Sequence, residues 1–267
     1  MTRSQLYDEM CLKASALCIG LDPDGSKLPA SIKNDPQGIL HFCKEIIDAT
    51  HDVCVAYKPN LAFFESLGPE GWKILEYLVK YIPSHLFTIA DAKRGDIGNT
   101  SKMYAKAFFE HLNFDAVTVA PYMGEDSVTP FLEFNDKWVI LLGLTSNKGS
   151  NDFQRLKLDN GSLLYETVLK ASSKWGNPEN MMYVVGATHG EEIGHVRTLL
   201  PEHFFLVPGV GAQGGDAKTV ISYGANDLGG LLINASRSIL YASDKEDFAQ
   251  KAREEAIRLN EEMSSLF

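Results

Sequence analysis

The chain of 267 residues lacks several features that would place it in a specialised class of protein. No apolar run reaches the roughly 18 residues that a membrane-spanning helix needs. The first residues, MTRSQ, lead into a polar segment without the apolar core of a secretion signal. No linker, low-complexity block or charge run divides the chain, so we expect one domain over residues 1–267. A hydrophobic content of 45% excludes a disordered or fibrous protein.

Basic residues are scarce relative to acidic ones, and cysteines are few. Lysine and arginine number 25 against 35 aspartates and glutamates, which gives a net charge of −10. Such a chain is a poor general binder of nucleic acid or membrane surfaces, and any anion must meet a local basic cluster. The four cysteines show no CxxC spacing, so we expect reduced, mostly buried thiols of a cytoplasmic protein (Cys11, Cys18, Cys43, Cys54).

Short apolar runs alternate with helical patterns along the whole chain. The runs are rich in Val, Ile and Leu and predict strands at 16–22, 54–60, 87–93, 116–121, 138–144, 182–187, 204–210 and 231–236. Helical spacing of apolar residues predicts helices at 38–50, from 69 to before 83, and at 100–112, 163–173, 193–200 and 247–263.

Eight strands that alternate with helices in about 250 residues are typical of a closed (β/α)₈ TIM barrel. An open, doubly wound sheet is the alternative that the spacing leaves open. In a barrel, catalytic groups lie at the C-terminal ends of the strands. Those ends carry acids and bases here, with Asp22 after the first strand, Lys58 after the second and Ser146 after the fifth.

The third strand ends in the segment DAKRGDIGNT, which is the strongest signal in the sequence. Asp91 and Lys93 are two residues apart, so both side chains leave the same face of a strand, and Asp96 follows in the loop. A single strand-terminal aspartate is usually a turn former or helix cap, and a single lysine is usually solvated. Two acids and two bases within six residues indicate instead a compact charged array at the barrel mouth.

A glycine-rich segment after the seventh strand is a candidate phosphate site. Loops after strands seven and eight of barrels bind phosphate through backbone N–H groups, and here Gln213 and Arg237 add side-chain donors. Gly209, Gly211 and Gly214 also match the dinucleotide pattern GxGxxG, but at the seventh strand rather than in the first βα turn.

Signals for metal binding or a nucleophile are weaker. His189, Glu191 and Glu192 follow the sixth strand, but no HExxH motif or paired Cys/His spacing accompanies them. No GxSxG elbow is present either. We therefore expect no metal and no cofactor.

The segment from Asp91 to Gly98, together with Thr100, resembles the signature of orotidine 5′-phosphate decarboxylases, especially their longer bacterial group. Further elements of the resemblance occur in the same order along nearly the whole barrel, namely GLD at 20–22, YKPN at 57–60, Ser146, PGVG at 208–211 and Ser236-Arg237. One departure is Ser236, which stands where many members have glycine.

The resemblance implies a catalytic array of Lys58, Asp91, Lys93 and Asp96. It implies substrate binding by seven further residues, with Asp22 on the ribose, Ser146 on the pyrimidine and Gln213 and Arg237 on the phosphate (Asp22, Ile97, Thr100, Ser146, Pro208, Gln213, Arg237). It also implies a homodimer in which Asp96, Ile97 and Thr100 reach the neighbouring active site.

The implied reaction converts orotidine 5′-monophosphate to uridine 5′-monophosphate (UMP) and CO₂, the last step of UMP biosynthesis, with Lys93 as the proton donor. Three other functions stay open from the residues alone. A metal-dependent sugar-phosphate decarboxylase would use the DxKxxD acids to hold Mg²⁺. A catalytically silent nucleotide-binding regulator and a nicotinamide-dependent oxidoreductase are the other two.

Overall fold

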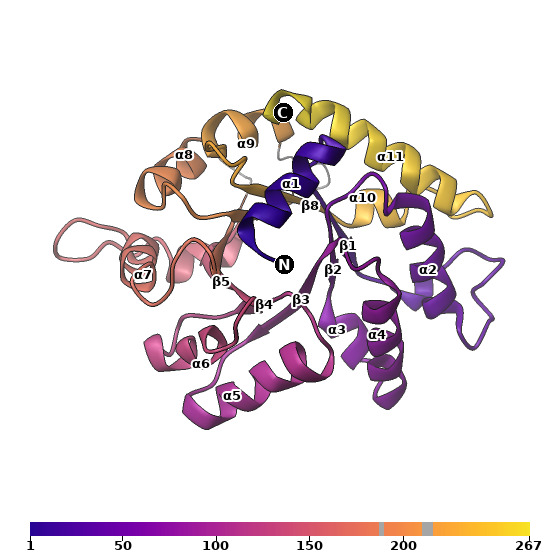
Figure 1. Cartoon of the computed structure of the whole chain (residues 1–267), viewed down its shortest axis with the longest axis horizontal. Helices are drawn as coiled ribbons and strands as arrows, with labels where there is room; N and C mark the ends of the chain where they lie inside the picture. The colour runs from indigo at the N-terminus through magenta and orange to yellow at the C-terminus, as the bar shows by residue number, and fades with distance from the viewer. Residues whose placement is uncertain (187–189, 210–215) are drawn as a thin grey trace.

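The computed structural model describes residues 1–186, 190–209 and 216–267. In this part of the chain eight parallel strands pair in chain order, and the last pairs with the first to close a barrel. The helices form a ring around the strands (Figure 1). The strands are β1 (Leu17–Leu21), β2 (Ala56–Pro59), β3 (Phe87–Arg94), β4 (Ala116–Val119), β5 (Trp138–Leu144), β6 (Met181–Val185), β7 (Phe205–Pro208) and β8 (Leu231–Ala235). The closed barrel is confirmed, and the open doubly wound sheet is excluded.

Each expected strand is present, with ends that differ from the prediction by at most two residues. The strands are buried along most of their length because their inner faces fill the barrel and their outer faces pack against helices. Continuous apolar runs such as that of β5 (WVILLGL) therefore fit this position better than alternating ones.

The surrounding helices include the expected ones and several that the apolar pattern did not reveal. They are α1 (Arg3–Lys13), α2 (Gly38–Thr50), α3 (Leu61–Glu65), α4 (Pro69–Tyr81), α5 (Gly98–Lys106), α6 (Thr129–Leu132), α7 (Leu164–Ser172), α8 (Gly190–Leu199), α9 (Ala217–Gly224), α10 (Arg237–Leu240) and α11 (Phe248–Met263). The helix expected at 100–112 is α5, which continues as a π-helical turn over Ala107–His111. None of the described helices is long and apolar enough to cross a bilayer.

Helix α1 was missed because it buries only Leu6 and Met10 and has little apolar periodicity. It lies at the N-terminal end of the barrel, where the Met1 ammonium contacts Asp115 at 3.0 Å. The Trp138 indole donates to the Met1 carbonyl at 2.8 Å. Asp115 precedes β4 and Trp138 begins β5, so α1 covers this end and leaves the opposite mouth to the polar strand ends.

A half-buried arginine and a buried histidine lie close together near the start of β7. Arg197 of α8 donates to the carbonyl oxygens of Gly224, His203 and Gly230, and its guanidinium stacks 3.8 Å from the ring centre of Phe205. His203 is 7% exposed, and neither ring nitrogen has a hydrogen-bond partner among the described residues. Burial, together with the charges of Arg197 and Arg3, lowers the pKa of His203 to about 4.

This histidine predicts a loss of stability in acid. Its pKa in the fold lies below the unfolded value of about 6.5, so the fold favours the neutral ring. The resulting stabilisation is present above pH 6.5 and is lost as the pH falls toward 4, by about 3 kcal/mol. We expect His203→Phe to lack this part of the pH dependence when urea unfolding is measured at pH 7, 5 and 4. The exposed His111→Gln is the control, and equal slopes for wild type and His203→Phe would contradict the prediction.

Candidate active site

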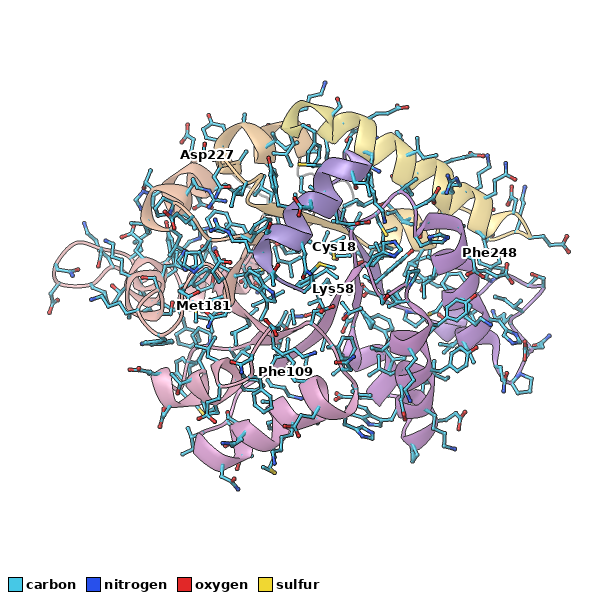
Figure 2. All side chains as sticks on the ribbon, in the orientation of Figure 1. Cys18, Lys58, Phe109, Met181, Asp227 and Phe248 are labelled. Carbon is cyan, nitrogen blue, oxygen red and sulfur yellow. The ribbon has the colours of Figure 1, made fainter. Side chains whose placement is uncertain are left out.

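Three charged side chains converge at the C-terminal ends of β2 and β3. Asp91 lies between two lysines, with one carboxylate oxygen 2.7 Å from Nζ of Lys58 and the other 2.5 Å from Nζ of Lys93. The side chains of Lys58 and Asp91 are 6% and 9% exposed, whereas that of Lys93 is 53% exposed. Lys58 lies near the centre of the ring of helices, close to Cys18 of β1 (Figure 2). Asp91 and Lys93 therefore lie together, although the irregular pairing of β3 with β4 at these residues, and not regular strand alternation, sets their positions.

Mutual attraction keeps the buried members of this array ionised. Burial alone would raise the pKa of Asp91, but the ammonium groups of Lys58 and Lys93 outweigh it and lower that pKa to about 2. Burial likewise disfavours the charged form of Lys58, yet Asp91 and Asp22 raise its pKa above the ordinary lysine value. At neutral pH the array thus holds a carboxylate between two cations in a poorly solvated place, where charge interactions are strong.

A cavity of about 190 Å³ opens beside this array. It is lined from the ends of β1, β2, β3, β7 and β8, which bring together residues far apart in the sequence (Asp22, Lys58, Asn60, Asp91, Pro208, Gly209, Asn234, Ala235, Ser236, Arg237). Three of the expected substrate-binding residues, Asp22, Pro208 and Arg237, therefore line one cavity. Asn60 and Asn234 also line the cavity but were not among the predicted site residues, although each lies at a strand end where the same rule applies.

Two oxygens of this cavity are buried without a hydrogen-bond partner among the described residues. They are Oδ1 of Asp22 and Oδ1 of Asn234. Burial also raises the pKa of Asp22, against the attraction of Lys58. Unpaired buried acceptors are costly, so their presence in a cavity indicates places where hydroxyl or N–H groups of a ligand bind.

Ser236 packs closely against a glycine of the neighbouring strand. A Cβ on Gly20 of β1 would lie 1.9 Å from the Ser236 hydroxyl oxygen, so a larger residue at position 20 would require the Ser236 side chain to move. Nδ2 of Asn234 donates to the same hydroxyl oxygen at 3.4 Å. The Gly20-Leu21-Asp22 segment and Ser236 thus fit one another across the β1–β8 pair.

Four of the predicted residues lie outside the array and the cavity lining. Asp96 accepts the Ile97 N–H at 2.8 Å, and none of the described hydrogen bonds or ion pairs joins it to Lys58, Asp91 or Lys93. Ile97 and Thr100 are exposed at the start of α5, and Ser146 follows β5. Gln213 lies outside the described residues, as do Gly211 and Gly214 of the GxGxxG match.

Neighbouring charges that could have joined the site have other contacts. Arg94 turns away to Glu65 of α3, and its guanidinium stacks on Tyr104 and Phe108. Glu192, one of the three residues considered as metal ligands from the sequence, forms an ion pair with Arg155. His189, another of the three, lies outside the described residues. The described residues contain no group of three or more potential metal ligands.

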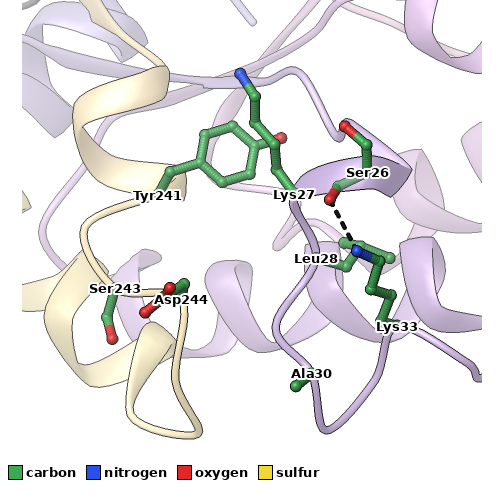
Figure 3. A pocket seen from close by; sticks show the side chains of 8 residues that line it. All are labelled: Ser26, Lys27, Leu28, Ala30, Lys33, Tyr241, Ser243 and Asp244. Carbon is green, nitrogen blue, oxygen red and sulfur yellow. Dashed lines mark hydrogen bonds between the residues drawn. The ribbon is translucent and has the colours of Figure 1, made fainter.

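A larger cavity of about 450 Å³ lies beside the site and lacks its chemistry. Figure 3 shows Lys27, Lys33 and Tyr241 among its lining side chains, with Lys33 donating to the Ser26 carbonyl at 3.2 Å. The Tyr241 hydroxyl of this cavity donates at 2.9 Å to the carbonyl oxygen of Asp22, a residue that lines the smaller cavity. The smaller cavity holds the converging strand ends, and for that reason it is the candidate active site.

Comparison with known proteins agrees with this geometry. Residues 15–252 match the model of the orotidine 5′-phosphate decarboxylase / HUMPS family. Orotidine 5′-phosphate decarboxylase of Flavobacterium johnsoniae is 56% identical over 269 residues, which cover 100% of this chain and 98% of that protein. The enzyme of the same name from Bacteroides fragilis is 55% identical over 99% of this chain and 97% of its own length.

Solved structures give the same result. The structure of Leishmania donovani OMP decarboxylase superimposes with a TM-score of 0.85 at 40% identity, covering 100% of this chain and 98% of that one. A putative orotidine-monophosphate decarboxylase from Toxoplasma gondii has a TM-score of 0.87 at 34% identity and covers 98% of this chain and 96% of its own. The chain therefore belongs to the orotidine 5′-phosphate decarboxylase family.

Proposed function

We propose that the charged cavity at the barrel mouth converts orotidine 5′-monophosphate to UMP and CO₂, the last step of UMP biosynthesis. The observation that carries this conclusion is the Lys58–Asp91–Lys93 array, which lies beside a cavity that also contains Arg237. The array supplies charge where a carboxylate leaves, and Arg237 supplies a cation for the phosphate of the same substrate.

In this reaction the bond between C6 of the pyrimidine and its carboxylate breaks, and both electrons stay on C6. No conventional electron sink accepts them, so a cation must stabilise the carbanion. Lys93 faces C6 in the proposed complex and transfers an Nζ proton to it, which forms UMP. The neutral Lys93 amine that remains takes up a proton from solvent after product leaves, which restores the ammonium that lies 2.5 Å from Asp91.

Asp91 and Lys58 prepare this step. Asp91 lies near the departing carboxylate in the proposed complex, where repulsion between like charges disfavours the substrate more than the transition state. Lys58 holds Asp91 ionised and oriented through the 2.7 Å contact. In the proposed complex Asp96 reaches this array from the partner subunit and completes the alternation of charges.

The remaining substrate contacts follow the ends of the other strands. We assign Asp22 to the ribose, because its buried Oδ1 lacks a hydrogen-bond partner among the described residues and accepts from a hydroxyl. Ser146 is assigned to the pyrimidine edge. Pro208, Gln213 and Arg237 are assigned to the phosphate end, where binding energy from a nonreacting group helps to order the reacting one.

A homodimer with shared sites belongs to the same proposal. None of the described contacts within one chain joins Asp96 to the array, and exposed apolar side chains occur in its loop, in α5 and after β4, with Ile97, Met103 and Tyr122 exposed by 53%, 47% and 90%. An exposed apolar cluster of this kind is typical of a surface that another chain covers. We infer that Asp96, Ile97 and Thr100 enter the active site of the partner subunit.

We further propose that residues 1–267 act as one decarboxylase domain in the cytoplasm. The family match spans 15–252 without interruption. All four cysteines are free, and Cys18, Cys43 and Cys54 are buried, which fits a reducing compartment.

The direct test of function is a single assay. Purified protein is incubated with orotidine 5′-monophosphate in the presence of a chelator, and loss of the orotate absorbance is followed. We expect turnover that does not change with the chelator. Absence of turnover would refute the proposed function, and activity that returns only with added Mg²⁺ would favour the metal-dependent alternative.

Arg237→Ala should weaken substrate capture rather than chemistry. A charge-assisted contact to phosphate is worth about 1.5–3 kcal/mol, so kcat/KM should fall about 10- to 100-fold, mostly through KM. Steady-state kinetics and competition by inorganic phosphate measure the effect. Lys27→Ala, a cation of the neighbouring cavity, is the control and should leave KM unchanged. A fall confined to kcat would contradict the assignment.

A further inference from the structure

Thr118 places a buried hydroxyl beside Asp91 and Lys93 of β3. It lies in β4 and is 1% exposed. Its Oγ1 accepts a hydrogen bond from the backbone N–H of Lys93 at 2.8 Å and donates to Oδ1 of Asp91 at 3.2 Å. The same carboxylate oxygen accepts a hydrogen bond from Nζ of Lys93 at 2.5 Å. One hydroxyl therefore contacts both the backbone of the proposed proton donor and the carboxylate beside it.

The backbone around Lys93 is irregular and needs such a contact. Ala90 pairs with Val117, but the next pair of this ladder is Arg94 with Val119. Residues 91–93 thus lie opposite the single residue Thr118. Within this bulge Lys93 has φ of 47°, a left-handed conformation that residues with a side chain rarely adopt. Bulges near active sites re-aim side chains, and strained residues persist where surrounding contacts hold them.

We propose that Thr118 is a positioning residue for the decarboxylation, because its hydroxyl clamps the bulge that presents Asp91 and Lys93 together. This inference rests on the proposed function. Without the hydroxyl, the Lys93 N–H loses its acceptor and Asp91 loses a donor, so the bulge relaxes while the phosphate and ribose contacts stay in place. A displacement of about 1 Å between reacting groups costs on the order of 100-fold in rate.

Thr118→Val tests the proposal because valine keeps the shape of threonine and removes the hydroxyl. We expect kcat to fall about 10- to 100-fold, with KM for orotidine 5′-monophosphate within about threefold of wild type. Thr118→Ser keeps the hydroxyl and should retain kcat within about threefold. A merely structural role would not produce this rescue by serine.

Thr88 offers a matched control in β3, the strand that carries Asp91 and Lys93. It is 6% exposed, and its hydroxyl donates to Asp115 at 2.8 Å at the opposite end of β3. Thr88→Val also removes a buried hydroxyl hydrogen bond, so we expect it to lower the urea midpoint of unfolding while kcat stays unchanged. If Thr88→Val lowers kcat as much as Thr118→Val, general loosening of the strand explains the effect and the proposal is wrong.

Other results also decide the matter. A folded Thr118→Val with wild-type kcat, or with a raised KM alone, overturns the proposal. So does a Thr118→Ser enzyme as slow as Thr118→Val. If Thr118→Val does not fold, Thr118→Cys replaces it, and a cysteine variant as fast as the serine variant overturns the proposal. An inactive wild type would instead refute the proposed function, so the two failures are distinguishable.

Discussion

Replacing Lys93 with alanine should abolish turnover while the protein stays folded. The ammonium of Lys93 both stabilises the carbanion and delivers the proton, so its removal withdraws electrostatic stabilisation and general acid catalysis together. Each is worth about 10²-fold or more, and we expect kcat to fall by at least about 10⁴-fold. The side chain is 53% exposed, so little packing is lost. Single-turnover loss of orotate absorbance measures the rate, and urea unfolding measures stability.

Two further variants make this test specific. Lys93→Arg keeps the positive charge, but a guanidinium does not give up a proton near neutral pH, so we expect kcat to fall by about 10²-fold or more through the loss of general acid catalysis alone. Lys73→Ala removes an exposed lysine of α4 and should leave turnover unchanged. A Lys93→Ala enzyme with near-wild-type turnover would show that another group supplies the proton and would overturn the mechanism.

Mixing two inactive variants should restore activity if the active sites are shared. In a hybrid dimer of Lys93→Ala and Asp96→Ala, one site carries both defects and the other carries neither. Random exchange makes half of the dimers hybrids, so about a quarter of wild-type activity should return in an equimolar mixture. The variants are refolded together, subunit exchange is verified by mass spectrometry, and turnover is compared with that of each variant alone.

The matched control pairs two lysines of the same cavity. In a hybrid of Lys58→Ala and Lys93→Ala each site lacks one lysine, because both residues come from the subunit that forms that cavity. This mixture should stay inactive. Equal recovery in both mixtures would indicate contamination, and no recovery with Asp96→Ala after verified exchange would refute the shared site.

The charged array at the barrel mouth was predictable because Asp91 and Lys93 are close in the sequence and because catalytic groups of barrels lie at the C-terminal ends of the strands. Asp91 and Lys93 are neighbours on one strand, and parallel strands of a closed barrel all end at the same mouth, which brings Lys58 and Arg237 to it. Thr118 was not predictable, since one threonine within an apolar strand carries no signal of its own. Its contacts depend on the irregular pairing of β3 with β4.

The amino-acid sequence alone determined the eight strands, their alternation with helices and the identity of the charged strand ends, because apolar periodicity and residue order are properties of the linear chain. Only the tertiary structure decided that the sheet closes into a barrel and which side chains meet. It directed Arg94 outward to Glu65 and left Asp96 apart from the array. It also placed unpaired oxygens of Asp22 and Asn234 in one cavity. Such contacts depend on strand register, on the bulge between β3 and β4, and on the closure of the barrel by β8 and β1. The closure joins residues more than two hundred positions apart, and no local sequence pattern encodes it.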